Sequence, residues 1–522
     1  MSTMMKRHPM WQVLAGMLLI AGIARSQAPS AQAVRASVRE YRQQHEVEIV
    51  RNYIELLSLP NVANDATNIR ANADLISAQL QKRGFTTRLL AVAGSPPVVY
   101  GELPAPGAKH TLLWYAHYDG QPVDKSQWAV DPWTPVLRDG LTTDASKTIA
   151  LDSLHAPLNP EWRLYARAAS DDKAPIQALL TALDALRAAK MPVNVNLKVF
   201  FEGEEEAGSP HLEAIMRENA GLLKGDVWLL SDGPVHQTRR MQVYFGARGV
   251  TDLEMTVYGP SRVLHDGHYG NWAPNPAALL VNLLASMRDA GSHILIPGYY
   301  ADVRRLSPAE SEALAQVPDV DAQLRQELGL AWTESSGHPV AAAISQPSIN
   351  IRGLEAGHVE SKAQNAIATE AKASLDFRLV PDQTPDKVRA LVEQFIQQQG
   401  FYIVRQAPDL ETRRTHARII KLTWGAGGYP AERTSMNDPA VSPVLAAIEQ
   451  TLGTPLVKMP MLGGSVPMYL FPDLLKTPVL GLPIANHDNN QHAANENLRL
   501  QNLWDGIEVF AGILTGVEGN WK

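Results

Sequence analysis

Apolar residues in the first half of the chain follow two alternating patterns. Between about residues 34 and 245, segments with helical spacing of apolar residues are separated by short runs that are apolar almost throughout. Runs of this kind are typical of strands covered on both faces, so they predict a mainly parallel sheet flanked by helices. The predicted strands are residues 111–116, 195–201 and 227–230, and the predicted helices are residues 47–57, 72–83 and 175–189.

A different pattern begins near residue 248. Half-exposed strands and helices follow in the order β-α-β-β-α-β, which predicts a ferredoxin-like α+β sandwich. Its elements are expected at residues 253–258, 275–288, 348–352, 371–380 and 385–399, with extended segments at 402–405 and 416–424. After about residue 429 the first pattern resumes, with a buried strand at 479–482. The fold class is therefore α/β with an inserted α+β unit: residues 34–247 and 430–522 form one domain, and residues 248–429 the insert. Two polar or proline-rich stretches, residues 139–160 and 306–338, are expected to be surface insertions.

The N-terminus has the pattern of a secretory signal peptide. Lys6 and Arg7 precede an apolar stretch at residues 10–23, and small residues then offer a cleavage site at 24–26 or as late as 31–33. An uncleaved anchor is the alternative, but about 14 residues fall short of the roughly 20 that a spanning helix needs. We therefore expect residues 1–26 to be removed, and the protein to be periplasmic or secreted, without stable membrane insertion.

Composition narrows the functional classes. The 522 residues carry a formal net charge of −7, and no basic run indicates a nucleic-acid partner. The chain contains no cysteine, so disulfides, thiolate metal sites and cysteine nucleophiles are excluded. Any metal must be held by nitrogen and oxygen ligands.

Histidines and acidic residues stand just after the predicted buried strands. His117 follows the first of these strands, Glu205 and Glu206 the second, and Asp232 the third, while His492 lies on the segment after the strand at 479–482. Ligands of open α/β sheets bind beyond the carboxyl ends of the strands. We therefore expect these side chains to meet at one rim of the sheet.

Together with Asp171, this set fits two divalent cations that share a bridging carboxylate. Zinc accepts histidine nitrogen and carboxylate oxygen, although cobalt or manganese could use the same ligands. We assign His117 and Asp232 to one metal, Glu206 and His492 to the other, and Asp171 to the bridge.

Two further residues complete the predicted centre. Asp119 is expected to hydrogen-bond the imidazole of His117 and fix its tautomer. Glu205 is left without a metal, so it is the predicted general base, which takes a proton from the metal-bridging water and passes it to the leaving amine. Singly, each residue has an ordinary alternative: a surface His-Asp pair, a solvated acidic face, a helix cap or a turn. Their joint placement at strand ends argues against coincidence.

With these motifs the chain resembles the co-catalytic di-zinc exopeptidases and deacylases. This family includes carnosinase-like dipeptidases, bacterial glutamate carboxypeptidase, acetylornithine deacetylase and succinyl-diaminopimelate desuccinylase. The resemblance covers roughly residues 47–516 and rests on YAHYDGQPVD, RAASDDKAP, FEGEEEAGSP, SDGP and QHAANE, in that order. It implies that the inserted unit is a lid that mediates homodimerisation, and that the peptide bond between Asp171 and Asp172 is cis.

The resemblance also implies roles for residues of the lid and of a late loop. His265 is similar to a lid histidine that reaches the partner subunit's active site and stabilises the oxyanion. Asn365 and Arg378 match a pair that contacts substrate, in which the arginine suits a terminal carboxylate. The loop Gly463, Gly464 and Ser465 resembles one that lets substrate approach the backbone. Charged residues often precede this double glycine in the family, whereas this chain has Met461 and Leu462.

The sequence therefore predicts an exported, zinc-dependent, homodimeric hydrolase that cleaves dipeptides or removes a C-terminal residue. An N-acyl-amino-acid deacylase needs the same metals and base and is the main alternative. A binding protein that has kept the fold without catalysis is a third interpretation, but such a protein would normally have lost Glu205 or a metal ligand.

Overall fold

The computed structural model describes the chain except for residues 2–28, 143–144, 336 and 522. Apart from Met1, the predicted signal peptide at residues 1–26 lies outside the described residues. The later cleavage site at 31–33 would fall in the first turn of helix α1 (Ala31–Leu57). Among the described helices, none combines the length and the apolar character needed to cross a bilayer.

The larger sheet has eight strands, and its central four are parallel to one another. The order is β1 (Thr86–Leu90), β2 (Val98–Leu103), β7 (Asn196–Glu202), β3 (Thr111–His117), β8 (Val227–Leu230), β20 (Val479–Gly481), β9 (Gln242–Tyr244) and β19 (Val457–Met459). β7, β3, β8 and β20 run in parallel, whereas β1–β2, β2–β7 and β20–β9 are antiparallel. The predicted α/β class is confirmed, with antiparallel strands added toward the edges.

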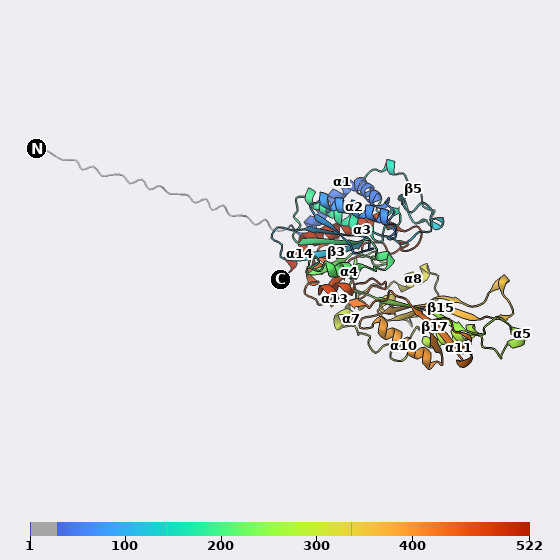
Figure 1. The fold of residues 1–522 in the computed structure, drawn as a ribbon. Helices are drawn as coiled ribbons and strands as arrows, with labels where there is room; N and C mark the ends of the chain where they lie inside the picture. Colours follow the sequence, from blue (N-terminus) through green and yellow to red (C-terminus); the bar gives the residue numbers. More distant parts are fainter. Residues whose placement is uncertain (2–28, 143–144, 336, 522) are drawn as a thin grey trace.

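Helices cover both faces of this sheet (Figure 1). One face packs against α1, α3 (Lys173–Ala188), α12 (Ser442–Leu452) and α14 (Leu500–Asn520), with α2 (Ala66–Lys82) beside β1 and β2. The short helices α4 (Leu212–Glu218) and α13 (Leu470–Leu475) cover the other face. Trp114, fully buried in β3, meets the ring of Phe510 on α14 at 4.4 Å between centroids. The last helix is thus part of the core.

The inserted unit contains a five-stranded sheet in the order β13 (Ser348–Glu355), β15 (Glu370–Leu379), β11 (Gly249–Tyr258), β17 (Ile419–Trp424) and β16 (Tyr402–Val404). Helices α6 (Pro276–Met287) and α10 (Pro385–Gln398) share a core with this sheet. Without the edge strand β16, the arrangement is the expected ferredoxin-like sandwich. At its far end lie β12 (Leu264–His265), β14 (Ala366–Ile367) and α5 (Asp266–Tyr269), with α11 (Leu410–Thr415) nearby (Figure 1).

The chain enters and leaves this unit side by side. β10 (Gly246–Ala247) pairs with β18 (Glu432–Arg433), so the two connections form a short antiparallel ribbon. A Cβ at Gly246 would lie 2.0 Å from the carbonyl oxygen of Glu432, and one at Gly249 would lie 2.4 Å from that of Tyr429. Only glycine allows the two connections to approach this closely.

The two predicted surface insertions are partly buried, so that prediction was only partly right. β5 (Thr148–Ile149) joins β4 (Val136–Arg138), β6 (Arg163–Tyr165) and β21 (Asn497–Arg499) in a small sheet. The second stretch forms α7 (Pro308–Ala315) and α8 (Asp321–Glu327), and α9 (Val340–Ala343) follows it. Helix α7 packs against β19, and its buried Glu310 pairs with the buried Arg433 at 2.8 Å. A polar sequence conceals such burial when its charged residues find partners.

Candidate metal centre and active site

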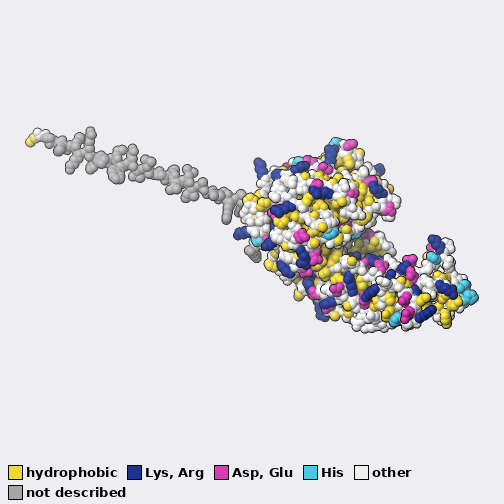
Figure 2. All heavy atoms as spheres, viewed as in Figure 1, with side chains coloured by type: hydrophobic (Ala, Val, Ile, Leu, Met, Phe, Trp, Pro, Cys, Tyr) yellow, Lys and Arg dark blue, Asp and Glu magenta, His cyan; other side chains and the backbone are white. Residues whose placement is uncertain are grey.

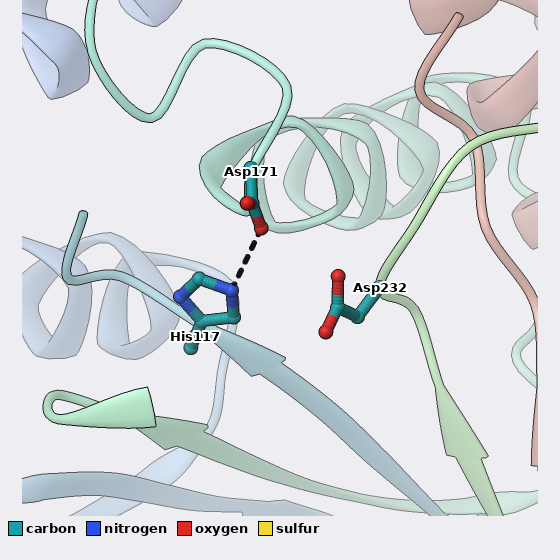
Figure 3. A group of neighbouring side chains, drawn as sticks. All are labelled: His117, Asp171 and Asp232. Carbon is teal, nitrogen blue, oxygen red and sulfur yellow. Dashed lines mark hydrogen bonds and ion pairs between the residues drawn. The ribbon is translucent and has the colours of Figure 1, made fainter. Parts of the chain in front are cut away.

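Three side chains from separate parts of the chain converge beyond the central strands (Figure 3). His117 is the last residue of β3, Asp171 lies just before α3, and Asp232 follows β8. The Nε2 atom of His117 lies 3.0 Å from Oδ1 of Asp171. One ligand atom from each of the three lies within 4.8 Å of the others, a spacing that suits a single cation.

A second group shares Asp171 with the first. Nε2 of His492 lies 3.2 Å from Oδ2 of Asp171 and 3.1 Å from Oε2 of Glu206. Ligand atoms of these three residues also fall within 4.8 Å of one another. The structure therefore forms the same two groups that the sequence predicted, with Asp171 between them. The peptide bond between Asp171 and Asp172 is cis, as the resemblance implied.

The polar atoms of this cluster fit a dinuclear metal site. Oδ2 of Asp171 is buried and faces Nε2 of His492 at 3.2 Å, which is itself a candidate metal ligand. An imidazole that binds a metal is neutral, so its nitrogen leaves the buried carboxylate oxygen without a donor, and a shared cation would satisfy both atoms. Every atom of the two groups that could ligate a metal is an imidazole nitrogen or a carboxylate oxygen, and zinc accepts both kinds of ligand.

The raised pKa values of the clustered acidic residues also indicate that cations bind here. Burial and the charge of Asp171 raise the pKa of Asp232 to about 7. Burial and Asp232 also raise the pKa of Glu205, although His117 opposes the shift. The hydrogen bonds to Asp171 and Glu206 raise the pKa of His492 to about 10. Bound divalent cations would offset the carboxylate repulsion, keep Asp232 and Glu205 ionised near neutral pH, and hold His492 as a neutral imidazole.

Asp119 connects the histidine to the acidic loop. Nδ1 of His117 faces Asp119, 3.1 Å from its carbonyl oxygen and 3.4 Å from its Oδ1. The carboxylate also accepts hydrogen bonds from the backbone N–H groups of Glu205 at 3.1 Å and Glu206 at 3.0 Å. The expected contact with the imidazole is therefore present, but it is shared with the backbone carbonyl. The anchoring of the acidic loop by Asp119 was not foreseen.

Glu205 lies beside the centre without belonging to either group. Its Oε2 is 3.9 Å from Nε2 of His117, and its side chain is 14% exposed. It begins the short 3₁₀ turn Glu205–Ala207, which directly follows the loop after β7. This position leaves its carboxylate available to exchange protons with a reacting group at the cluster.

Glu496 is a site residue that sequence reasoning missed. Its fully buried carboxylate accepts five hydrogen bonds from the segment that ends at Asp171. The donors are Nη1 of Arg167 at 2.9 Å, N–H of Ala168 at 3.0 Å, N–H and Oγ of Ser170 at 2.8 and 2.9 Å, and N–H of Asp171 at 3.0 Å. Because Glu496 is four residues after His492, it ties two ligand loops together. The only feature of the sequence that pointed to Glu496 was its place as the last residue of the QHAANE motif.

Arg378 and the late loop lie together at the base of the lid. Nη1 of Arg378 donates to Oγ of Ser465 at 2.7 Å, and its Nε donates to Asp376 at 3.2 Å. Gly463 and Gly464 have neither a positive φ nor a backbone contact that a Cβ would violate. Gly464 is exposed, but the carbonyl oxygens of Gly463 and Gly464 accept from Nε and N–H of Arg248 at 3.0 and 3.2 Å, so the close approach of substrate to this loop stays a prediction.

His265 and Asn365 lie at the other end of the lid. His265 pairs with Ala366 between β12 and β14, and the N–H of Asp266 donates to the carbonyl of Asn365 at 3.2 Å. The side chain of His265 is 59% exposed, and histidine side chains gather at this tip of the molecule (Figure 2). β15 alone has ten residues, so Asn365 is separated from Arg378 by about 30 Å of extended strand. The two residues expected to contact one substrate are not brought together within one chain.

Comparison with known proteins agrees with this geometry. The family model "Peptidase family M20/M25/M40" matches residues 113–516, which is most of the chain. The chain belongs to this family.

Individual relatives of this M20 chain are of similar length. The Cys-Gly metallodipeptidase dug1 of Schizosaccharomyces pombe is 26% identical over 89% of this chain and 94% of its own. The human Beta-Ala-His dipeptidase is 27% identical over 80% and 76% of the two chains. Among solved structures, the M20 family metallo-carboxypeptidase Sso-CP2 of Sulfolobus solfataricus superposes with a TM-score of 0.73 at 28% identity, covering 90% of this chain and 99% of that one. The M20 chain is thus a metallopeptidase, a hydrolase that acts on peptide bonds.

Proposed function

We propose that this chain is an exported, homodimeric dipeptidase with two zinc ions per subunit. The observation that carries the proposal is the pair of ligand groups that share Asp171, with Glu205 beside them. Relatives described as metallodipeptidases match the chain over most of its length, which favours dipeptides over longer peptides or N-acyl amino acids.

The residues of the cluster have two roles in this proposal, metal binding and proton transfer. His117 and Asp232 would hold one zinc ion, Glu206 and His492 the other, and Asp171 both. When bound, the ions supply Lewis acidity and lower the pKa of coordinated water. Glu205 takes a proton from the attacking water and delivers it to the amine that leaves.

Arg378 and the loop at Ser465 orient the substrate. Arg378 holds the free carboxylate of the dipeptide, because guanidinium matches carboxylate in charge and geometry. Asp376 at 3.2 Å and Ser465 at 2.7 Å hold the arginine in place. Because Gly463 and Gly464 carry no side chains, the substrate can lie close to this loop.

Hydrolysis of a mixed panel of dipeptides and N-acyl amino acids tests the proposal. The zinc-loaded protein is compared with Glu205→Gln and with Glu213→Gln, a control glutamate that pairs with Arg217 on the surface of α4. We expect release of amino acids from dipeptides, near-complete loss in Glu205→Gln with unchanged zinc content, and full activity in the control. Turnover of the N-acyl compounds alone would assign the deacylase function instead.

The separation of the lid residues supports the proposed homodimer. His265 and Asn365 are too far from Arg378 to reach the same active site, so they would serve the site of a partner subunit. The edge strand β13 offers a surface for this contact, because it exposes Ile351 and Leu354 at 42% and 55%.

A mixture of two inactive variants tests this arrangement. Glu205→Gln and His265→Ala damage different sites of a mixed dimer only if His265 acts within its own chain. If His265 acts across the dimer, one site of each mixed dimer is intact, and an equal mixture refolded together regains about a quarter of wild-type activity. No recovery, or a monomer with unchanged activity in analytical ultracentrifugation, would contradict the dimer.

Export is proposed from the sequence of residues 1–26. Expression of the full chain in a bacterial host, followed by fractionation and N-terminal sequencing, tests it. We expect periplasmic or secreted protein that begins near residue 27, or near residue 34 if the later site is used.

A further inference from the structure

A cavity of about 430 Å³ lies between the catalytic domain and the segment that holds α7, α8 and α9. Its volume is within the range of about 300–1,000 Å³ typical of small-molecule pockets. Four parts of the chain contribute to its lining: residues 234–237, Gln242 and Tyr244 of β9, residues between 459 and 463, and residues between 314 and 321 together with 339–342 and Ile344.

Two of these parts continue directly from the active site. Residues 234–237 begin two positions after the metal ligand Asp232, and Gly463 opens the loop that leads to Ser465. Tyr244 in the cavity wall donates its hydroxyl to the carbonyl of Asp232 at 2.9 Å. Leu462 lies against Gly233, where a Cβ would be 3.6 Å from its Cδ2. The cavity wall therefore contacts the backbone of the candidate metal ligand Asp232 and of its neighbour Gly233.

The wall nearest the site is apolar. Met461 is fully buried, and Leu462 and Ile344 pack with the same core cluster as Tyr244. No charged side chain from this stretch of wall enters the cavity.

The polar groups of the lining bond within the wall itself. Asp319 accepts from the N–H of Asp321, and Asp321 accepts from the N–H of Val340, each at 3.0 Å. Gln242 donates to the carbonyl of Pro234 at 2.7 Å, and Nδ1 of His236 contacts the hydroxyl of Thr238 at 2.8 Å. Asp319 and Asp321 belong to the wall far in sequence from the metal site, whereas the wall that continues from the site is formed by Met461, Leu462 and Ile344, so this part of the cavity suits an apolar side chain.

We propose that this cavity is the specificity pocket for a large aliphatic or aromatic side chain of the substrate. The proposal rests on the proposed dipeptidase function and names the substrate class within it. Burial of a leucine or phenylalanine side chain contributes about 1.5–3 kcal/mol, which corresponds to roughly 10–150-fold in kcat/KM.

Filling the cavity from α9 tests the proposal. Ala341 is buried and lines the cavity, whereas Ala343 on the same helix does not, so Ala341→Phe and Ala343→Phe are a matched pair. Ala342→Phe also enters the cavity and replaces Ala341→Phe if that variant fails to fold. The assay measures kcat/KM for the series X-Ala and Ala-X, with X as Gly, Ala, Leu, Phe, Asp or Lys.

In one of the two series, we expect the wild type to prefer Leu and Phe over Ala by at least about tenfold. Ala341→Phe should lose this preference while hydrolysing Ala-Ala normally, and Ala343→Phe should keep it. In the Glu205→Gln background, which binds without turnover, calorimetry should show the same preference in Kd. A preference that survives in Ala341→Phe, or an equal preference for Asp or Lys, would overturn the pocket. No turnover of Ala-Ala by the wild type would instead overturn the dipeptidase function, and the pocket with it.

Discussion

Substitution of Glu496 by glutamine should weaken metal binding without removing any metal ligand. Oε1 of Glu496 accepts from Ser170 and Asp171, and Oε2 accepts from Arg167 and Ala168. A glutamine keeps one acceptor but turns the other end into a donor, so at least two buried donors lose their partner. Each such donor costs about 1–3 kcal/mol, or roughly 2–6 kcal/mol together.

The segment at residues 167–171 is expected to relieve this cost by moving, and Asp171 moves with it. Loss of a group that orients a ligand typically lowers metal affinity 10–100-fold. We therefore expect Glu496→Gln to bind zinc 10–100-fold more weakly than the wild type, measured by competition with a chromophoric chelator. At saturating zinc, activity should largely return, because Glu205 and all the ligands remain.

Glu508→Gln is the matched control. Glu508 is also a buried carboxylate near the C-terminus, but it pairs with Arg35 at 2.7 Å and Arg39 at 2.8 Å, away from the site. It should lower the melting temperature and leave zinc affinity unchanged. Wild-type zinc affinity in Glu496→Gln, or an equal loss of affinity in Glu508→Gln, would refute the reasoning.

Three other outcomes are expected. Burial raises the pKa of Glu202 to about 8, so the folded state holds a proton that the unfolded chain releases above about 4.5, and stability falls as pH rises between these values. A glutamine at position 202 can still accept the hydrogen bond from Tyr115. Thermal unfolding should therefore show that Glu202→Gln stabilises the protein by roughly 3–5 kcal/mol at pH 8.5 and hardly at pH 5. Equal effects at the two pH values would contradict this expectation. Arg378→Lys should raise KM for dipeptides about tenfold with a smaller change in kcat, because lysine cannot form the two-pronged contact; a loss in kcat alone would assign the arginine another role. Chelator treatment should abolish hydrolysis, and activity should return only as the second equivalent of zinc per chain is added; full recovery at one equivalent would argue against the second ligand group.

The candidate metal ligands His117, Glu206 and Asp232 were predictable because each lies at or shortly after the end of a buried strand. His117 and Asp232 follow apolar runs that are easy to recognise, and parallel strands bring their carboxyl ends to one rim. The ferredoxin-like insert was predictable because the sequence pattern changes at its start, from continuous apolar runs to strands in which apolar and polar residues alternate.

Contacts between distant segments were not predictable. The bonds of Glu496 depend on how two loops meet, and a glutamate near the end of a motif does not reveal them. The strand expected at residues 371–380 already separates Asn365 from Arg378, but the sequence does not show which active site each of the two residues serves. The burial of α7 was missed because a glutamate such as Glu310 is expected to be exposed unless its partner, here Arg433, is known.

The place of the last helix and its preceding loop in the core has a consequence for biosynthesis. His492 and Glu496 are translated about 260 residues after Asp232, and α14 packs against α1, the first described helix. The lid is contiguous in sequence and can fold while the rest is still being made, whereas the catalytic domain must wait for its final residues. A complete metal centre therefore cannot assemble on a growing chain. This order postpones both zinc capture and hydrolytic activity until almost the whole chain has been synthesised.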